Sequence, residues 1–144
     1  MIRPVKLFRV SPSAKLPTKG TPGSAYWDLY AAEQVTIDDR CIELVSTGWR
    51  IEVPEGYFLD VRPRSGLAIH GVTINNSPGV IDADYRGELR IVLINLGPAP
   101  WVVQIGDRIA QCALMPVVAT SFEASLEELS PTTRGTQGYG STGR

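Results

Sequence analysis

One internal segment of the chain combines the groups that bind phosphate esters. Pro63–Ala68 (PRSGLA) follows a β-type run and supplies Arg64, Ser65 and Gly66. A guanidinium pairs with phosphate oxygens, a hydroxyl donates to them, and a glycine lets the backbone come close. Gly106–Gln111 is unremarkable taken alone, because Asp107 and Arg108 could simply form a structural ion pair at a turn.

Gly79–Glu88 (GVIDADYRGE) places three carboxylates, an arginine and an aromatic ring between two apolar runs. A charged hairpin turn would explain the same composition, so this segment alone does not establish a site.

The end of the chain, Arg134–Arg144 (RGTQGYGSTGR), is rich in glycine and carries one aromatic ring. Such a segment loses much backbone entropy on ordering and has little to bury, so we expect it to be mobile in the free protein. Successive amides with Ser141 and Thr142 could form an anion-binding nest. A plain disordered tail is the alternative, as is common at chain ends.

Several other chemistries are disfavoured by the residue inventory. No lysine follows Lys19, so the Walker pattern is absent. One histidine and two distant cysteines do not give the usual spacings of a zinc site. Ser65 with His70 as its base would form a nucleophilic pair, but no G-x-S-x-G elbow surrounds Ser65. We therefore expect His70 to be a surface or structural residue.

The preference for arginine over lysine in this chain suits phosphate binding. Only Lys6, Lys15 and Lys19 are lysines among the 14 basic residues, and all later cations are arginine. Arginine binds phosphate oxygens in pairs, although a GC-rich genome would give the same bias. The net charge of -1 argues against a protein that coats nucleic acid, so no nucleic-acid partner is expected.

The elements that must position these groups are short β-type runs separated by proline and glycine. Tyr57–Arg62 alternates apolar and polar residues with the period of a half-buried strand. Regular turn signals predict an all-β fold, a jelly-roll-like sandwich or barrel. Only Ala124–Leu129 looks helical. The expected strands are Val5–Val10, Trp27–Ala31, Ile42–Val45, Gly48–Val53, Tyr57–Arg62, Val72–Ile74, Leu89–Asn95, Trp101–Gln104 and Arg108–Val118.

The chain of 144 residues fits a single domain. We expect a β domain over residues 1–133 and a flexible C-terminal arm over 134–144. No run has the length of a signal peptide core or a membrane span, so no membrane partner is expected. Two cysteines suit reduced thiols, and the expected compartment is the cytoplasm.

Taken together, the segments resemble the trimeric dUTPase family (deoxyuridine 5′-triphosphate nucleotidohydrolase). That family has five short motifs in fixed order, and the resemblance covers nearly the whole chain. The first motif usually has glycine and tyrosine where this chain has Tyr26 and Trp27, and the fifth usually has glycine and phenylalanine where it has Gln137 and Tyr139. The five counterparts are Ser24–Ala32, Pro63–Ala68, Gly79–Glu88, Gly106–Gln111 and Arg134–Gly143.

The resemblance implies Mg²⁺-assisted hydrolysis of dUTP to dUMP and pyrophosphate, which would limit uracil incorporation into DNA and supply dUMP for thymidylate synthesis. It assigns the attacking water to Asp82 and gives Asp28 contact with Mg²⁺ through water. It also implies a homotrimer with sites between subunits. The implied phosphate-binding residues are Arg64, Ser65, Gln111 and Arg134, and the implied substrate-binding residues are Asn76, Gly79, Val80, Ile81, Tyr85, Tyr139, Gly140, Ser141 and Thr142.

Three alternatives stay open at the level of sequence. A dCTP deaminase shares the fold but is typically longer and lacks the glycine-rich ending. A non-catalytic nucleotide sensor would have no need of a water-positioning carboxylate such as Asp82. A generic jelly-roll binding module would require five ordered matches to arise by chance.

Overall fold

The chain folds almost entirely into β-strands, as expected from the sequence. The computed structural model describes residues 2–141. The strands are β1 (Lys6–Arg9), β2 (Trp27–Tyr30), β3 (Val35–Ile37), β4 (Ile42–Glu52), β5 (Tyr57–Arg62), β6 (Val72–Ile74), β7 (Gly79–Ile81), β8 (Glu88–Asn95), β9 (Trp101–Val103) and β10 (Arg108–Pro116), and the one helix in this range is α1 (Ser65–Ala68).

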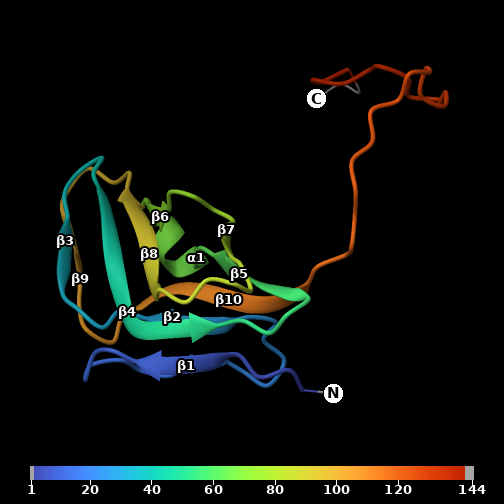
Figure 1. Cartoon of the computed structure of the whole chain (residues 1–144). Coiled ribbons are helices and arrows are strands. Elements are labelled where there is room, and N and C mark those ends of the chain that lie inside the picture. Colours follow the sequence, from blue (N-terminus) through green and yellow to red (C-terminus); the bar gives the residue numbers. More distant parts are fainter. Residues whose placement is uncertain (1, 142–144) are drawn as a thin grey trace.

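Two antiparallel four-stranded sheets form the body of the molecule (Figure 1). One has the order β1-β4-β8-β6 and the other β2-β10-β5-β7, while β3 and β9 make a two-stranded ribbon. The buried cluster draws on both large sheets, with Leu29 and Val61 from one and Val45 and Leu93 from the other. This arrangement confirms the jelly-roll-like sandwich.

β8 shows how the sequence builds this sandwich. Leu89, Ile91 and Leu93 alternate along the strand and are fully buried, whereas Glu88 and Arg90 point the other way. Side chains alternate between the faces of a strand, so a period of two commits one face to the core. The outward face of β8 remains available for other contacts.

The sheet that contains β2, β10 and β5 carries a polar row on its outward face. Asp28 is paired with Gln111, and Gln111 with Arg62, in neighbouring antiparallel strands. Directly opposite residues in such strands point to the same face. Three polar side chains from distant parts of the sequence therefore share one surface.

Two of the expected strands are in fact one. The sequence predicts Ile42–Val45 and Gly48–Val53 separately, but β4 runs through both as Ile42–Glu52. Its register against β8 shifts between Ser46 and Arg50, and Gly48 takes a φ of 73° at this irregularity. A glycine with positive φ marks a bulge within the strand and does not end it.

Two further expectations fail. Ala124–Leu129 forms no helix, because six residues are too few to nucleate one without a surface to pack on. The three-residue strands β3 and β7 are missed, although β3 has the same sequence, VTI, as the correctly predicted β6. The helix present, α1, begins instead at Ser65 in the arginine–serine segment.

The C-terminal stretch leaves the body after β10 and runs away from it (Figure 1). The amide of Val117 donates to the carbonyl of Gly56 at 2.9 Å, the last backbone hydrogen bond to the body in the described range. Residues 118–141 then hydrogen-bond only among themselves.

Candidate active site

A polar pocket of about 360 Å³ opens on the outward face of the β2-β10-β5 sheet. Three stretches far apart in the sequence meet there, namely the segment that ends in β2, the start of α1 and the beginning of β10. Four of the predicted site residues, Asp28, Arg64, Ser65 and Gln111, line it together. The complete lining, which we call the anion pocket, is Gly20, Ser24, Ala25, Tyr26, Asp28, Arg64, Ser65, Arg108 and Gln111.

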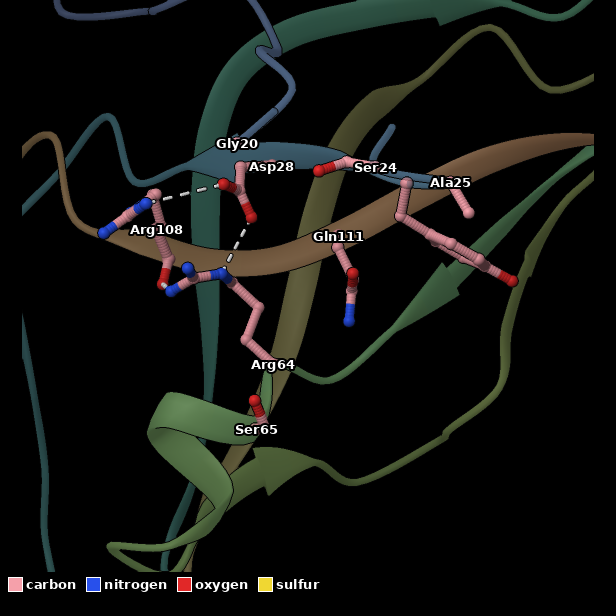
Figure 2. A pocket seen from close by; sticks show the side chains of 9 residues that line it. Gly20, Ser24, Ala25, Asp28, Arg64, Ser65, Arg108 and Gln111 are labelled. Atoms are coloured by element: carbon pink, nitrogen blue, oxygen red, sulfur yellow. Dashed lines mark hydrogen bonds and ion pairs between the residues drawn. The ribbon is translucent and has the colours of Figure 1, made fainter. Parts of the chain in front are cut away.

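Two arginines share one carboxylate in this pocket (Figure 2). Arg64 donates through Nε to Oδ1 of Asp28 at 2.8 Å, and Nη1 of Arg108 lies 3.7 Å from Oδ2. The Asp28 side chain is only 13% exposed, so it depends on these partners. Two positive charges against one negative charge leave a net attraction for anions.

Arg108 is a site residue that the sequence interpretation missed. Asp107 was available as its partner, but Oδ2 of Asp107 instead accepts the Gln104 amide at 2.8 Å. Arg108 is thereby left to face Asp28 across the sheet. The signal in the sequence was that four of the five motif segments carry an arginine, and Arg108 is the one in Gly106–Gln111.

Gln111 and Ser65 occupy the middle and the edge of the anion pocket. Gln111 donates through Nε2 to the carbonyl of Pro63 at 2.8 Å, which fixes the amide next to the turn that carries Arg64. Figure 2 shows Gln111 between the arginine group and the Ser24–Ala25 stretch. Ser65 begins α1 and is exposed, so its hydroxyl is accessible.

The two aromatic residues that precede Asp28 lie on opposite sides of β2. Tyr26 lines the anion pocket, whereas Trp27 lines an apolar groove on the other face of the sheet. Lys19 lies over the Trp27 ring at 5.4 Å. Asp28 itself keeps its place among the arginines despite these large neighbours.

A second pocket, of about 260 Å³, contains the predicted water-positioning residue. Asp82 and Tyr85 line it, and the Tyr85 hydroxyl donates to the carbonyl of Glu88 at 2.9 Å. The Tyr85 ring lies against Gly87, where a β-carbon would overlap it. The lining also includes Arg90, which sequence reasoning missed, and the complete set is Leu44, Val80, Ile81, Asp82, Tyr85, Glu88 and Arg90.

Asn76 and Gly79 lie beside this second pocket in a small cavity of about 30 Å³. Ile81 and Arg90 line both spaces. β7 pairs with β5 through Gly79 and Ile81. It supplies Gly79 to the small cavity and Val80 to the second pocket. The candidate base-binding residues therefore form one continuous region.

The predicted site residues thus fall into separate groups within one chain. The anion pocket and the Asp82 pocket have no lining residue in common. Arg134, Tyr139, Gly140 and Ser141 lie on the arm and line neither pocket, and Thr142 lies outside the described residues. Only the first two groups are formed by the body of a single chain.

Local environment shifts the pKa of two groups next to the anion pocket. The hydrogen bond to Asp60, with desolvation and the Asp60 charge, raises the pKa of the Tyr26 phenol. Burial, with a contribution from the Asp28 charge, raises the pKa of the Cys112 thiol to about 12. Both groups stay protonated at neutral pH.

The acidic residues do not form a direct metal cage. Within residues 2–141 no group of three or more His, Cys, Asp or Glu side chains could hold a metal ion. Asp28 is the one acidic residue that lines the anion pocket. Across the same range, no helix is long and apolar enough to cross a membrane.

The fold and the site together define an all-β domain with an arginine–carboxylate pocket for anions. A family model described as dUTPase matches residues 12–143. The chain is 48% identical over 132 residues to the deoxyuridine 5′-triphosphate nucleotidohydrolase of Chlamydia pneumoniae, covering 90% of this chain and 91% of that protein. It is 43% identical to the Wolinella succinogenes protein of the same name, covering 97% and 94%.

Solved structures agree with these relatives on the fold. The Staphylococcus bacteriophage 80alpha dUTPase G164S mutant with dUpNHpp superimposes with a TM-score of 0.89 at 23% identity, over 99% of this chain and 100% of that one. The D95N mutant dUTPase of phage phi11, whose structure reveals the coordination of a structural Mg(II) ion, gives 0.80 at 21% identity over 89% and 100%.

The chain belongs to the dUTPase family. Membership of that family makes it an enzyme, a dUTP diphosphatase.

Proposed function

We propose that the enzyme hydrolyses dUTP by attack of water on the α-phosphorus, releasing dUMP and pyrophosphate. The observation that carries this proposal is the pair of arginines on either side of Asp28, with Gln111 and Ser65 beside them. A new bond forms between the water oxygen and phosphorus, and the departing pyrophosphate keeps the electron pair of the broken P–O bond. Arginines fixed before substrate arrives stabilise that charge without reorganising.

Asp82 is the residue we assign to the attacking water. Its carboxylate is exposed at the second pocket and has no hydrogen-bond or ion-pair partner in the described part of the chain, so it is available to a water molecule. A carboxylate is only a weak base toward water, so proton abstraction contributes less than positioning. We therefore expect Asp82 to act mainly by holding the water in line with the bond that breaks.

Magnesium suits the anion pocket as an ion that accompanies the phosphates. Mg²⁺ keeps several waters and is bound through one or two carboxylates plus phosphate oxygens. A single acidic residue in the pocket fits that requirement. Asp28 would hold the ion through its water shell, and the bound ion would neutralise charge on the triphosphate. The relative from phage phi11 contains a structural Mg(II) ion.

We assign recognition of the nucleoside to the β7 region. Backbone groups of Gly79, Val80 and Ile81, helped by Asn76, would read uracil, and cytosine would leave them unpaired at roughly 1–3 kcal/mol for each group. Tyr85 would press against the deoxyribose, and its bond to Glu88 keeps the ring in place. From the arm, Tyr139 would stack on the base, while Gly140, Ser141 and Thr142 would contact phosphates.

The complete site requires more than one copy of the chain. The anion pocket, the Asp82 pocket and the arm lie apart within one chain, so we propose a homotrimer with sites between subunits. The outward face of β4 and β8 supports such assembly, because Leu44 is paired with Val92 and Ile42 with Ile94 on an apolar surface. Leu44 and Ile42 are 44% and 48% exposed.

The arm would then close over the substrate, with Arg134 reaching the terminal phosphate. A closing segment excludes water and completes the catalytic group. Analytical ultracentrifugation tests the assembly, since a monomer at all working concentrations would contradict it.

The free thiols of Cys41 and Cys112 support the proposal that the enzyme works in the cytoplasm. There it would limit uracil incorporation into DNA and supply dUMP for thymidylate synthesis.

Turnover of dUTP in ¹⁸O-labelled water tests the reaction. We expect the heavy oxygen in dUMP and none in pyrophosphate, because water attacks the α-phosphorus. Label found in pyrophosphate would contradict the assignment. Incubation with dCTP in place of dUTP provides the control, and deamination of dCTP would favour the related deaminase activity.

A further inference from the structure

Tyr26 makes a contact across the sheet that the proposed chemistry does not use. Its hydroxyl donates to Oδ2 of Asp60 at 2.8 Å, and Nε of Arg62 donates to the same oxygen at 2.8 Å. Tyr26 belongs to the segment that runs into β2, whereas Asp60 and Arg62 lie on β5, with β10 between them. One carboxylate oxygen thus joins two separate segments.

The strand register explains how a tyrosine reaches so far. Trp27 is paired with Cys112 on β10, so Tyr26 comes alongside Ala113, which is itself paired with Asp60 on β5. Alternate residues point to the same face, so Tyr26 lies on the face that Asp28 occupies. The small side chain of Ala113 leaves room for the Tyr26 ring to pass over β10.

Asp60 is an unusual neighbour for a pocket that binds anions. Its side chain is only 5% exposed, and a buried carboxylate depends on its donors. Tyr26 lines the anion pocket and also contacts Asp60, whereas Asp60 itself does not line the pocket. The phenol therefore stands between a buried negative charge and the place where phosphate would lie.

We propose that Tyr26 is a positioning residue of the anion pocket, which ties β2 to Asp60 and keeps that carboxylate away from bound phosphate. The inference depends on one part of the proposed function, namely that the anion pocket binds phosphate. The phenol stays a donor at neutral pH, in keeping with its raised pKa. Loss of the ring would open the pocket toward a charge of the same sign as the ligand.

Binding of inorganic triphosphate, measured by titration calorimetry, tests this role without requiring turnover. Tyr26→Phe keeps the ring but loses the bond to Asp60, and we expect a roughly threefold loss of affinity. Tyr26→Ala removes both, and we expect a loss of about tenfold. Adding Asp60→Asn to Tyr26→Ala should restore most of that loss, because the exposed charge is gone. If the role of Tyr26 were purely structural, the double variant would bind triphosphate more weakly than Tyr26→Ala alone.

Tyr57→Phe is the matched control, because Tyr57 lies on β5 outside the pocket and its hydroxyl has no hydrogen bond within residues 2–141. Thermal unfolding of each variant shows whether it is folded, and Tyr26→Phe remains informative if Tyr26→Ala is not. Unchanged triphosphate affinity in Tyr26→Phe and Tyr26→Ala, or a further loss on adding Asp60→Asn, would overturn the inference.

Turnover of dUTP by the same proteins separates the inference from the proposed function. We expect the KM for dUTP to rise with the loss of triphosphate affinity while kcat changes little. A wild-type protein that binds triphosphate but does not release pyrophosphate from dUTP would contradict the proposed function alone. Normal turnover with an unchanged KM in both Tyr26 variants would contradict the inference alone.

Discussion

At the scale of single residues, charge balance organises the anion pocket. Asp28 is largely buried between Arg64 and Arg108, and removing one partner of such a group costs more than the pair contributes. The carboxylate therefore keeps two arginines close together that would otherwise repel each other. Contacts within the chain therefore fix the two guanidinium groups of the proposed phosphate site.

Asp82→Asn tests the residue assigned to the water. We expect turnover of dUTP to fall at least about 100-fold, because the amide positions water poorly and cannot accept its proton. Affinity for dUpNHpp should stay near the wild-type value, as measured by calorimetry. Asp84→Asn is the control, since Asp84 is exposed in the same loop and lines neither pocket. Equal losses in both variants would show that the loop as a whole matters and not this carboxylate.

The two cysteines should differ sharply in reactivity. Cys41 is exposed and Cys112 is buried, with its pKa raised to about 12. The thiolate is the reactive form, so a thiol reagent at pH 8 should label Cys41 in the folded protein and both residues after unfolding. Rapid labelling of Cys112 in the native protein would contradict the burial described for it.

The same shift predicts a loss of stability at high pH. The Cys112 thiol has a pKa near its ordinary value of 9.0 in the unfolded chain, whereas burial raises the pKa to about 12 in the folded protein. The folded state binds the proton more tightly, so stability is full below pH ~9 and falls as the pH rises toward the folded value. Denaturation of Cys112→Ala compared with wild type across this range measures the contribution.

At the scale of elements, local irregularities determine where the site residues lie. The bulge in β4 at Gly48 lets one strand run past both β1 and β8 while its register changes. A β-carbon on Gly48 would lie 2.7 Å from that of Ala14 and 2.8 Å from that of Ser11. The strand can make this turn only with glycine there.

Gly48→Ala should therefore destabilise the fold by about 2–4 kcal/mol, from the positive φ and the overlap together. Gly56→Ala is the matched control, since Gly56 has a φ of 79° but open space around it. It should lose only the backbone part, roughly 1–2 kcal/mol. Urea denaturation gives both values, and equal losses would show that the contacts around Gly48 are unimportant.

Strands with clear alternation were predicted within a residue or two, and Tyr57–Arg62 and Val72–Ile74 were predicted at their full bounds. A break between two strands was wrongly predicted at Gly48, because a glycine can either end a strand or form a bulge within it, and the sequence does not distinguish the two. The meeting of Asp28, Arg64 and Arg108 could not be derived from spacing alone. It depends on the register of β10 against β2 and β5, which only the packed sheet determines.

At the scale of the whole molecule, the body and the arm are distinct parts. Residues 118–141 make no hydrogen bond to the body, and Phe122, Leu126 and Leu129 are more than 80% exposed. Residues 118–141 therefore contribute no side chain to the buried core. In the proposed enzyme, the arm acts by closing over the substrate.

Deletion of residues 134–144 should abolish turnover while the unfolding midpoint and the assembly state stay the same. The reason is that Arg134 and Tyr139 are exposed and bond to nothing in the body. Differential scanning calorimetry and ultracentrifugation, beside a turnover assay, measure the three quantities. A large shift of the midpoint would show that the arm is part of the folded core.

The position of Val117, the last residue bonded to the body in the described range, also determines how far the C-terminal stretch can reach. Residues 118–141, fully extended at ~3.3 Å each, could span about 80 Å, whereas a domain of this size has a radius of gyration near ~15 Å. The extended stretch is therefore longer than the width of a neighbouring subunit in a compact assembly. In the proposed homotrimer, the length of this stretch therefore does not decide which subunit the arm can reach, and the fit of the arm to the binding surface does.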